Sequence, residues 1–147
     1  MQLYFLSVIT CLLSGLVLLS KKQTEEISIG DKKNLLEDVN KSLKESELFK
    51  NKNFELIVAI ITFLVGVLKL FFVAKGGLII LGDLFPALMG ITSGFAIFLH
   101  YFISTATTKP EFPSFIKIVF IDNIYWVGLA SLIVAVVHFI MPGVIFF

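Results

Sequence analysis

The sequence predicts an all-α integral membrane protein, folded as a four-helix bundle, and two observations carry this prediction. Four apolar runs of 18 residues or more contain almost no charge; they cover residues 3–20, 56–74, 78–104 and 124–141. A helix that rises about 1.5 Å per residue crosses a hydrocarbon layer of roughly 30 Å in about 20 residues. The chain of 147 residues is also 57% apolar, above the roughly 45–50% of soluble domains. We therefore expect one membrane domain with four spans.

The first run is predicted to be a retained helix and not a cleaved signal peptide. No basic residue precedes Leu3, and Lys21 and Lys22 follow Ser20 where a small-residue cleavage site would stand. The single cysteine, Cys11, lies inside this run and has no second cysteine to pair with, so we interpret it as a packing residue.

One long polar segment, residues 21–53, separates the first two runs and carries eight Lys. Within it, residues 31–49 are predicted to form an amphipathic helix, because Leu36, Val39 and Leu43 share one face at spacings of three and four. Two interpretations stay open. The helix lies against its own bundle or the lipid headgroups, or it is a docking helix for a partner protein.

Lysine asymmetry predicts the topology. Lys109 and Lys117 follow the third run, whereas the link between the second and third runs holds only Lys75. Lysine-rich loops stay on the cytoplasmic side of a membrane. We therefore place loops 21–53 and 105–116 in the cytoplasm and both termini outside, with the bacterial cytoplasmic membrane as the predicted location.

The segment before the fourth run is ambiguous. Pro110 and Pro113 interrupt any helix there, and an apolar stretch then leads to Asp122 and Asn123. Residues 112–123 either lie in the membrane interface or extend the fourth helix. In both cases we expect Asp122 at the water boundary, and it is a candidate residue of a binding site or ion path.

The third run carries a row of small residues and a proline at every fourth position: Gly82, Pro86, Gly90 and Gly94. Gly90 and Gly94 form a GxxxG pattern, which lets two membrane helices approach closely. The row predicts a helix-packing face. The packing partner is either a helix of the same chain or a second copy.

Asp83 is an acidic residue inside the third run and needs a partner, because a carboxylate in the hydrocarbon layer costs at least about 2.5–3.5 kcal/mol. Lys69 lies at nearly the same depth on the other side of the short turn at residues 75–77, so we predict that the two groups pair. The pair either fixes the register of the hairpin or lines a polar pocket or ion path. Alternatively, Lys69 extends to the membrane surface.

The two histidines, His138 in the fourth run and His100 in the third, are further candidates for an ion path. A lone histidine near the interface is more commonly a polar anchor than a ligand. They lie near opposite sides of the membrane and so cannot share a metal ion. No His, Cys or Glu cluster has ligand spacing, and we predict no metal and no cofactor.

These observations favour a non-enzymatic accessory, assembly or scaffold subunit that binds other membrane proteins or further copies of itself. The alternative is a small oligomeric ion or solute transporter or channel that uses Asp83 and Lys69. A membrane enzyme acting on a lipid-linked substrate is a third and weaker hypothesis. Membrane lipid is the expected environment. The net charge of +1 and the lack of Arg argue against nucleic-acid binding.

Overall fold

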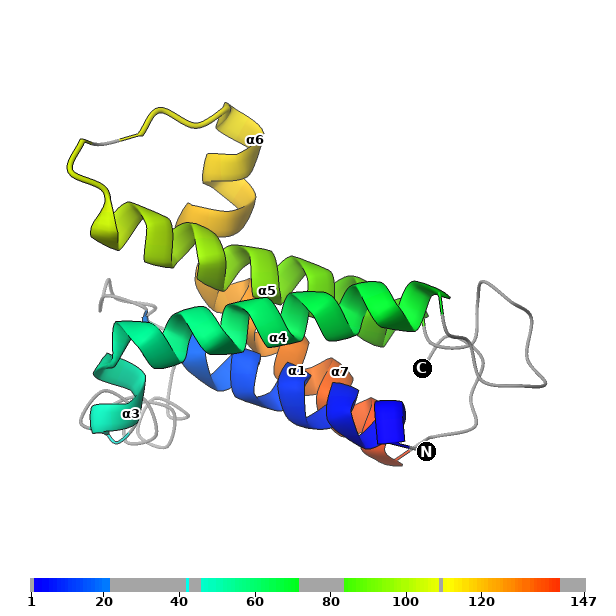
Figure 1. The fold of residues 1–147 in the computed structure, drawn as a ribbon. Coiled ribbons are helices and arrows are strands. Elements are labelled where there is room, and N and C mark those ends of the chain that lie inside the picture. Colours follow the sequence, from blue (N-terminus) through cyan, green and yellow to red (C-terminus); the bar gives the residue numbers. More distant parts are fainter. Residues whose placement is uncertain (1, 22–41, 43–45, 72–83, 109, 141–147) are drawn as a thin grey trace, which may run out of the picture.

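The computed structural model describes residues 2–21, 42, 46–71, 84–108 and 110–140, and every regular element among them is helical. The elements in chain order are α1 (Gln2–Ser20), α3 (Glu47–Lys50), α4 (Lys52–Phe71), α5 (Leu84–Thr105), α6 (Ser114–Ile116), the π-helix η1 (Lys117–Asp122) and α7 (Ile124–Ile140). The four long helices α1, α4, α5 and α7 run along one another as a bundle (Figure 1).

Three of the helices are long and apolar enough to cross a membrane, namely Leu3–Ser20, Lys52–Phe71 and Leu84–Thr105. The fourth predicted run is different. Helix α7 has 17 residues, and it reaches a full span only together with the preceding segment Ser114–Asp122, which meets it at 62°. The described residues thus contain three candidate spans, or four if Ser114–Asp122 and α7 together form one bent span.

An asparagine precedes each of two long helices and explains where they begin. Asn51 accepts a hydrogen bond at its side-chain oxygen from the backbone N–H of Asn53, 2.9 Å away, which is the usual cap of a helix N-terminus. Helix α4 therefore begins at Lys52, four residues before the predicted start at residue 56. This shift brings Glu55 into the first turn of α4, where the helix dipole stabilises a carboxylate.

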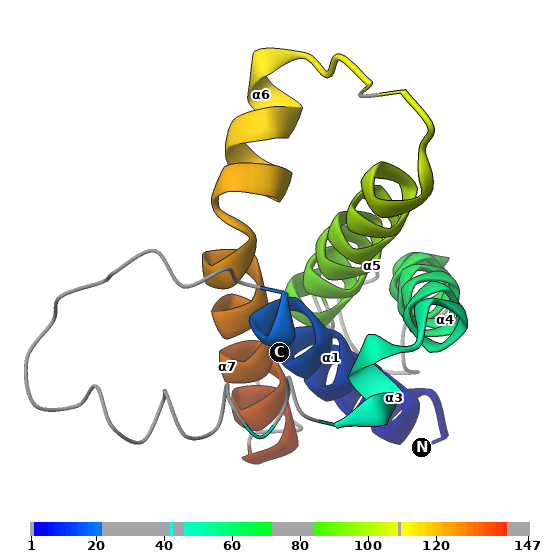
Figure 2. The same cartoon turned by 90° about the vertical axis from the view of Figure 1, so that its left-hand side faces the viewer.

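Asn123 marks the bend between η1 and α7. Its side-chain amide donates to the carbonyl of Ile118 over 2.8 Å, and its own carbonyl accepts from Trp126 at 3.0 Å. The segment that the sequence left ambiguous, residues 112–123, is thus a separate helical piece and not a straight extension of α7. It stands away from the packed helices (Figure 2) and contacts α5 through the rings of Phe95 and Phe120, whose centroids are 5.1 Å apart.

The bundle is built from two tight helix pairs, α4 with α5 and α1 with α7. Glycines set both contacts. A Cβ on Gly66 would stand 2.7 Å from the backbone nitrogen of Ile91, and one on Gly15 would stand 2.9 Å from the carbonyl oxygen of Gly128. Helix α1 also packs against α4 and α5, so the two pairs share one interior.

Two predicted features fall largely outside the described residues. Of the amphipathic helix expected at 31–49, the structure describes only residue 42 and the stretch from residue 46, where α3 begins at Glu47. Residues 72–83, including Gly82 and Asp83, also lie outside. The predicted Lys69–Asp83 pair therefore stays a prediction.

Candidate functional site

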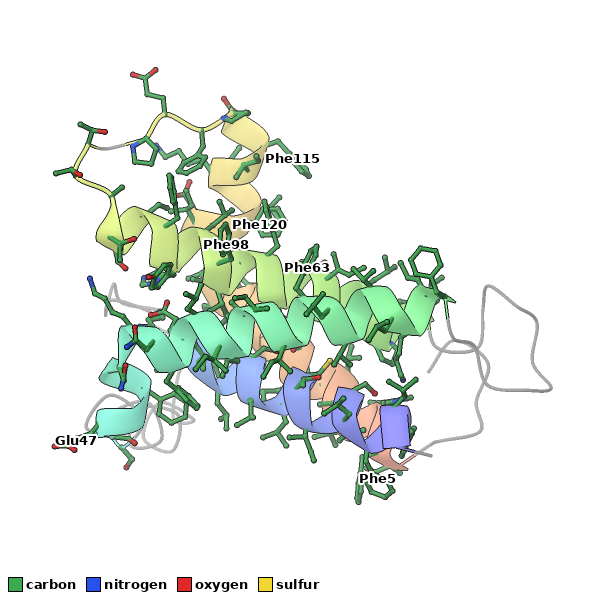
Figure 3. All side chains as sticks on the ribbon, viewed as in Figure 1. Phe5, Glu47, Phe63, Phe98, Phe115 and Phe120 are labelled. Atoms are coloured by element: carbon green, nitrogen blue, oxygen red, sulfur yellow. The ribbon has the colours of Figure 1, made fainter. Side chains whose placement is uncertain are left out.

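Polar side chains are concentrated inside the helical bundle, and large apolar side chains cover its outside. The buried polar residues are Ser7, Thr10, Ser14, Ser20, Glu55, Thr62, Lys69, Ser93, Ser131 and His138. Large apolar residues with over a third of their surface exposed occur on every long helix. Figure 3 shows one of them, Phe5, pointing away from the bundle. The large exposed apolar side chains and the many buried polar ones are both unusual for a water-soluble domain, although the interior also holds buried apolar residues.

At one end of the bundle, Glu55 is bound by two basic side chains. Its Oε2 accepts from Lys21 Nζ over 2.8 Å, and its Oε1 lies 2.9 Å from Nδ1 of His100. The glutamate side chain is 2% exposed, whereas those of Lys21 and His100 are 17% and 34% exposed. A buried carboxylate thus meets its partners at the edge of the interior. We call this the Glu55 end.

At the opposite end, Lys69 and His138 meet inside the bundle. Lys69 Nζ lies 2.8 Å from Nε2 of His138, and the two residues are 2% and 1% exposed. The hydroxyl of Tyr4 donates to the carbonyl of His138, and its ring lies 5.9 Å from the Lys69 nitrogen. An ammonium group can only donate, so with Lys69 charged the imidazole is neutral and accepts at Nε2. We call this the Lys69 end.

Three serine hydroxyls meet between the two ends, and we call this group the serine level. Ser14 Oγ lies 3.0 Å from Ser93 Oγ and 3.1 Å from Ser131 Oγ, which joins α1, α5 and α7. Ser93 donates to the carbonyl of Met89, and Ser131 donates to that of Cys11. Each hydroxyl therefore has partners, and the burial of all three leaves no polar group unsatisfied.

The Glu55 end, the serine level and the Lys69 end follow one another at a regular spacing along the helices. Polar residues recur every seventh position: Ser7 and Ser14 on α1, with Lys21 in the turn directly after it; Glu55, Thr62 and Lys69 on α4; Ser93 and His100 on α5; Ser131 and His138 on α7. Seven residues of helix rise about 10.5 Å, so Glu55 and Lys69 are about 21 Å apart along α4. We call this line of groups the polar axis.

The polar axis is interrupted by one apolar stretch. Between the serine level and the Glu55 end lies a cluster of buried residues to which all four long helices contribute: Val17, Leu18, Val58, Ala59, Ala96, Ile97 and Ile124. We call it the apolar cluster. Toward the Lys69 end, by contrast, Thr10 and Thr62 continue the polar lining, and Thr62 Oγ1 lies 3.4 Å from the Thr10 carbonyl. The hydrogen-bonding side chains of the polar axis are therefore interrupted by the apolar cluster next to the Glu55 end.

The other residues singled out in the sequence take varied positions. Gly90 and Gly94 are buried against α4 of the same chain, and Pro86 lies in the first turn of α5 as described. Asp122 is exposed. Lys69 is buried beside His138 and does not extend to the surface, so that alternative is wrong.

Sequence reasoning missed Glu55, Lys21, Tyr4 and the serine level. Glu55 follows a run of charged and amide residues and looks like part of a solvated loop. The seven-residue recurrence of polar positions within apolar runs was the available signal, because such a repeat stays on one helix face.

The described residues contain no group of three or more His, Cys, Asp or Glu side chains that could hold a metal ion. A sequence model of one protein family matches residues 1–138. The chain belongs to this family, whose function is unknown. No curated protein and no solved structure matches the chain.

Proposed function

We propose that the chain spans a membrane with α1, α4, α5 and α7, and that its polar axis conducts a small cation, protons included. The observation that carries the proposal is the polar axis itself. Ionisable groups stand near both ends of an interior that is otherwise lined by hydroxyls and one apolar cluster. Buried charges in membrane helices are costly and are typical of ion and proton paths.

The apolar outer surface supports membrane insertion. Side chains such as Phe71, Ile133 and Phe139 are more than half exposed, and hydrocarbon would cover them at no cost. Insertion is tested by washing isolated membranes with alkaline carbonate. The chain should stay with the lipid, and its release into the wash would contradict the proposal.

The lysine distribution supports an orientation with the Glu55 end in the cytoplasm. Lys21 and Lys52 lie at this end, and Lys117 lies in η1, which precedes α7 there. The first residues of α1 and the last residues of α7 then face outward. Cysteine-reactive labels applied to intact cells, with one cysteine added at position 52 or at position 2, would test the orientation.

Ion flux into liposomes is the direct test of conduction. Purified protein would be reconstituted with a trapped pH-sensitive dye, or with dyes for Na⁺ and K⁺, and compared with protein-free vesicles. We expect flux above the protein-free rate for one cation, and a large loss of it in Lys69→Met. Lys52→Met is the matched control, because Lys52 lies on the same helix but is exposed. If vesicles with correctly folded protein take up none of the three cations faster than protein-free vesicles do, the proposal is contradicted.

Assembly with other membrane proteins or with further copies stays a prediction. It depended on the small-residue row of the third run, the short connections and the lack of catalytic motifs, and in this chain α4 already packs against Gly90 and Gly94 of that row. The geometry therefore gives more support to conduction than to assembly.

A further inference from the structure

We infer that the conducted ion is a proton, and that Glu55 with His100 forms the site where it is exchanged with water at the Glu55 end. This inference depends on the proposed function, since it names the ion and its binding site. It begins with the contrast between a carboxylate that is 2% exposed and an imidazole that is 34% exposed. The histidine reaches water, and the glutamate reaches the interior.

The hydrogen bond between the two side chains fixes the histidine tautomer. A carboxylate has no proton to give, so Nδ1 of His100 must carry the proton shared with Oε1 of Glu55, 2.9 Å away. In the neutral ring, Nε2 then has the free lone pair. The ring thus presents a proton acceptor on the side away from the buried acid.

This arrangement can pass one proton inward. Nε2 of His100 takes a proton from a hydronium ion, which leaves as water, and the N–H bond at Nδ1 breaks as its proton moves to Oε1 of Glu55. The ring is neutral again, with its proton on Nε2, and the carboxyl group is protonated. One proton has left the water and one resides on Glu55, so atoms and charge balance.

Lys21 favours the reverse step, in which the proton on Oε1 returns to Nδ1 of His100 and Nε2 gives its proton to water. Its ammonium group is 2.8 Å from Oε2 and stabilises the carboxylate form of Glu55 by direct charge pairing. Of the other charged groups in the described elements around this end, Lys52 is exposed and donates to the carbonyl of Ser104, and Glu47, Lys117 and Asp122 are exposed. Lys21 and His100 are therefore the groups that directly contact Glu55.

The same geometry disfavours a metal cation. Both oxygens of Glu55 are already occupied, by Lys21 and by His100, and no second acidic side chain of the described residues joins them. The helices also approach to backbone contact, because a Cβ at Gly94 would lie 2.7 Å from the nitrogen of Phe63. A hydrated ion needs a wide path, whereas a proton moves between hydrogen-bonding groups, which in this axis are interrupted at the apolar cluster.

The decisive variant is His100→Asn. An asparagine amide nitrogen occupies nearly the place of Nδ1 and still donates to Glu55, but it cannot accept and release a proton. We expect proton flux into dye-loaded liposomes to fall at least about tenfold while thermal stability in detergent stays close to wild type. Glu55→Gln should abolish proton flux as well, and Lys52→Gln is the matched surface control.

Two spectroscopic readouts are independent of flux. The chain has two histidines, so ¹⁵N spectra of the imidazoles can be assigned with one variant. Nδ1 of neutral His100 should be the protonated nitrogen in wild type, and this preference should weaken in Glu55→Gln. Infrared difference spectra on acidification should show a protonated carboxyl band, one component of which is missing in Glu55→Gln.

The outcomes separate the two proposals. Proton flux that is undiminished in a stable His100→Asn protein overturns the inference and leaves conduction standing. Flux of Na⁺ or K⁺ without protons does the same. If no cation crosses through folded wild-type protein, the proposed function itself fails. If the carboxyl band of Glu55→Gln is identical to that of wild type, with no component missing, Glu55 is not the group that takes up the proton.

Discussion

Lys69 on α4 lies 2.8 Å from His138 on α7, although these two helices are not close neighbours within the described bundle. The tight pairs are α4 with α5 and α1 with α7, so the contact crosses the interior diagonally. A long lysine side chain can bridge this distance, and both groups are almost fully buried there. The contact ties the two helix pairs together at one end.

The first prediction concerns the energy of this contact. Lys69→Met should lower the free energy of unfolding by about 1–3 kcal/mol, because it removes the hydrogen-bonding partner of a buried imidazole nitrogen. A double-mutant cycle with His138→Phe should give a coupling of about 0.5–3 kcal/mol. Denaturant titration in mixed micelles measures both. A coupling near zero would mean that the contact contributes nothing to stability.

A second prediction ranks three glycines by the atoms that a new methyl group would meet. At Gly66 and Gly94 the Cβ would stand 2.7 Å from backbone nitrogen, whereas at Gly90 the nearest atom is 3.1 Å away. Alanine at Gly66 or Gly94 should therefore destabilise the protein by about 1–3 kcal/mol, since backbone cannot move aside as a side chain can. Gly90→Ala should cost clearly less.

The same unfolding assay provides the control for this ranking. Leu88→Ala removes an exposed side chain from the same helix and should change stability little. Equal costs at all three glycines would show that the close α4–α5 approach is not what these residues provide.

A third prediction concerns the serine level. Ser14→Ala should lower stability by about 0.6–2 kcal/mol, because interhelical hydrogen bonds of hydroxyls inside membranes have this size. Ser20→Ala is the matched control. Ser20 is also buried, but it donates to the carbonyl of Val17 on its own helix, so its loss should cost less. Alanine has a high helix propensity at both positions, so the difference in stability between the two variants reports the hydrogen bonds between helices.

Hydropathy predicted the long helices α1, α4, α5 and α7, though not the bend before α7, and side-chain partners could not be inferred from it. Lys69 and His138 both lie in apolar runs, and both were placed near one membrane face from their positions in the chain. Depth along a helix follows from residue counting, whereas the rotation of each helix follows from packing at residues such as Gly15 and Gly94. The partner of Lys69 within the described residues is therefore on α7, a helix that residue counting alone gave no reason to pair with it.

Glu55 shows the same limit at the other end. Its partners Lys21 and His100 are 34 and 45 residues away in the sequence. Local composition around Glu55 predicts solvent, and only the start of α4 at Lys52 places this carboxylate in the interior. What the sequence does contain is a polar residue at every seventh position of α4, from Glu55 through Thr62 to Lys69, which keeps all three on one face of the helix.

The final prediction concerns the apolar cluster. Ile97 is fully buried within it, between the level of Ser93 and that of His100. Apolar constrictions oppose ion and proton passage because water does not fill them. Ile97→Thr places a hydroxyl in this stretch, whereas Ile97→Val has almost the same shape without one. We expect severalfold faster proton flux in Ile97→Thr than in Ile97→Val, measured in the same liposomes. Matched flux in the two variants, at matched stability, would show that the apolar cluster is not the barrier, because the two side chains differ in polarity and hardly in volume.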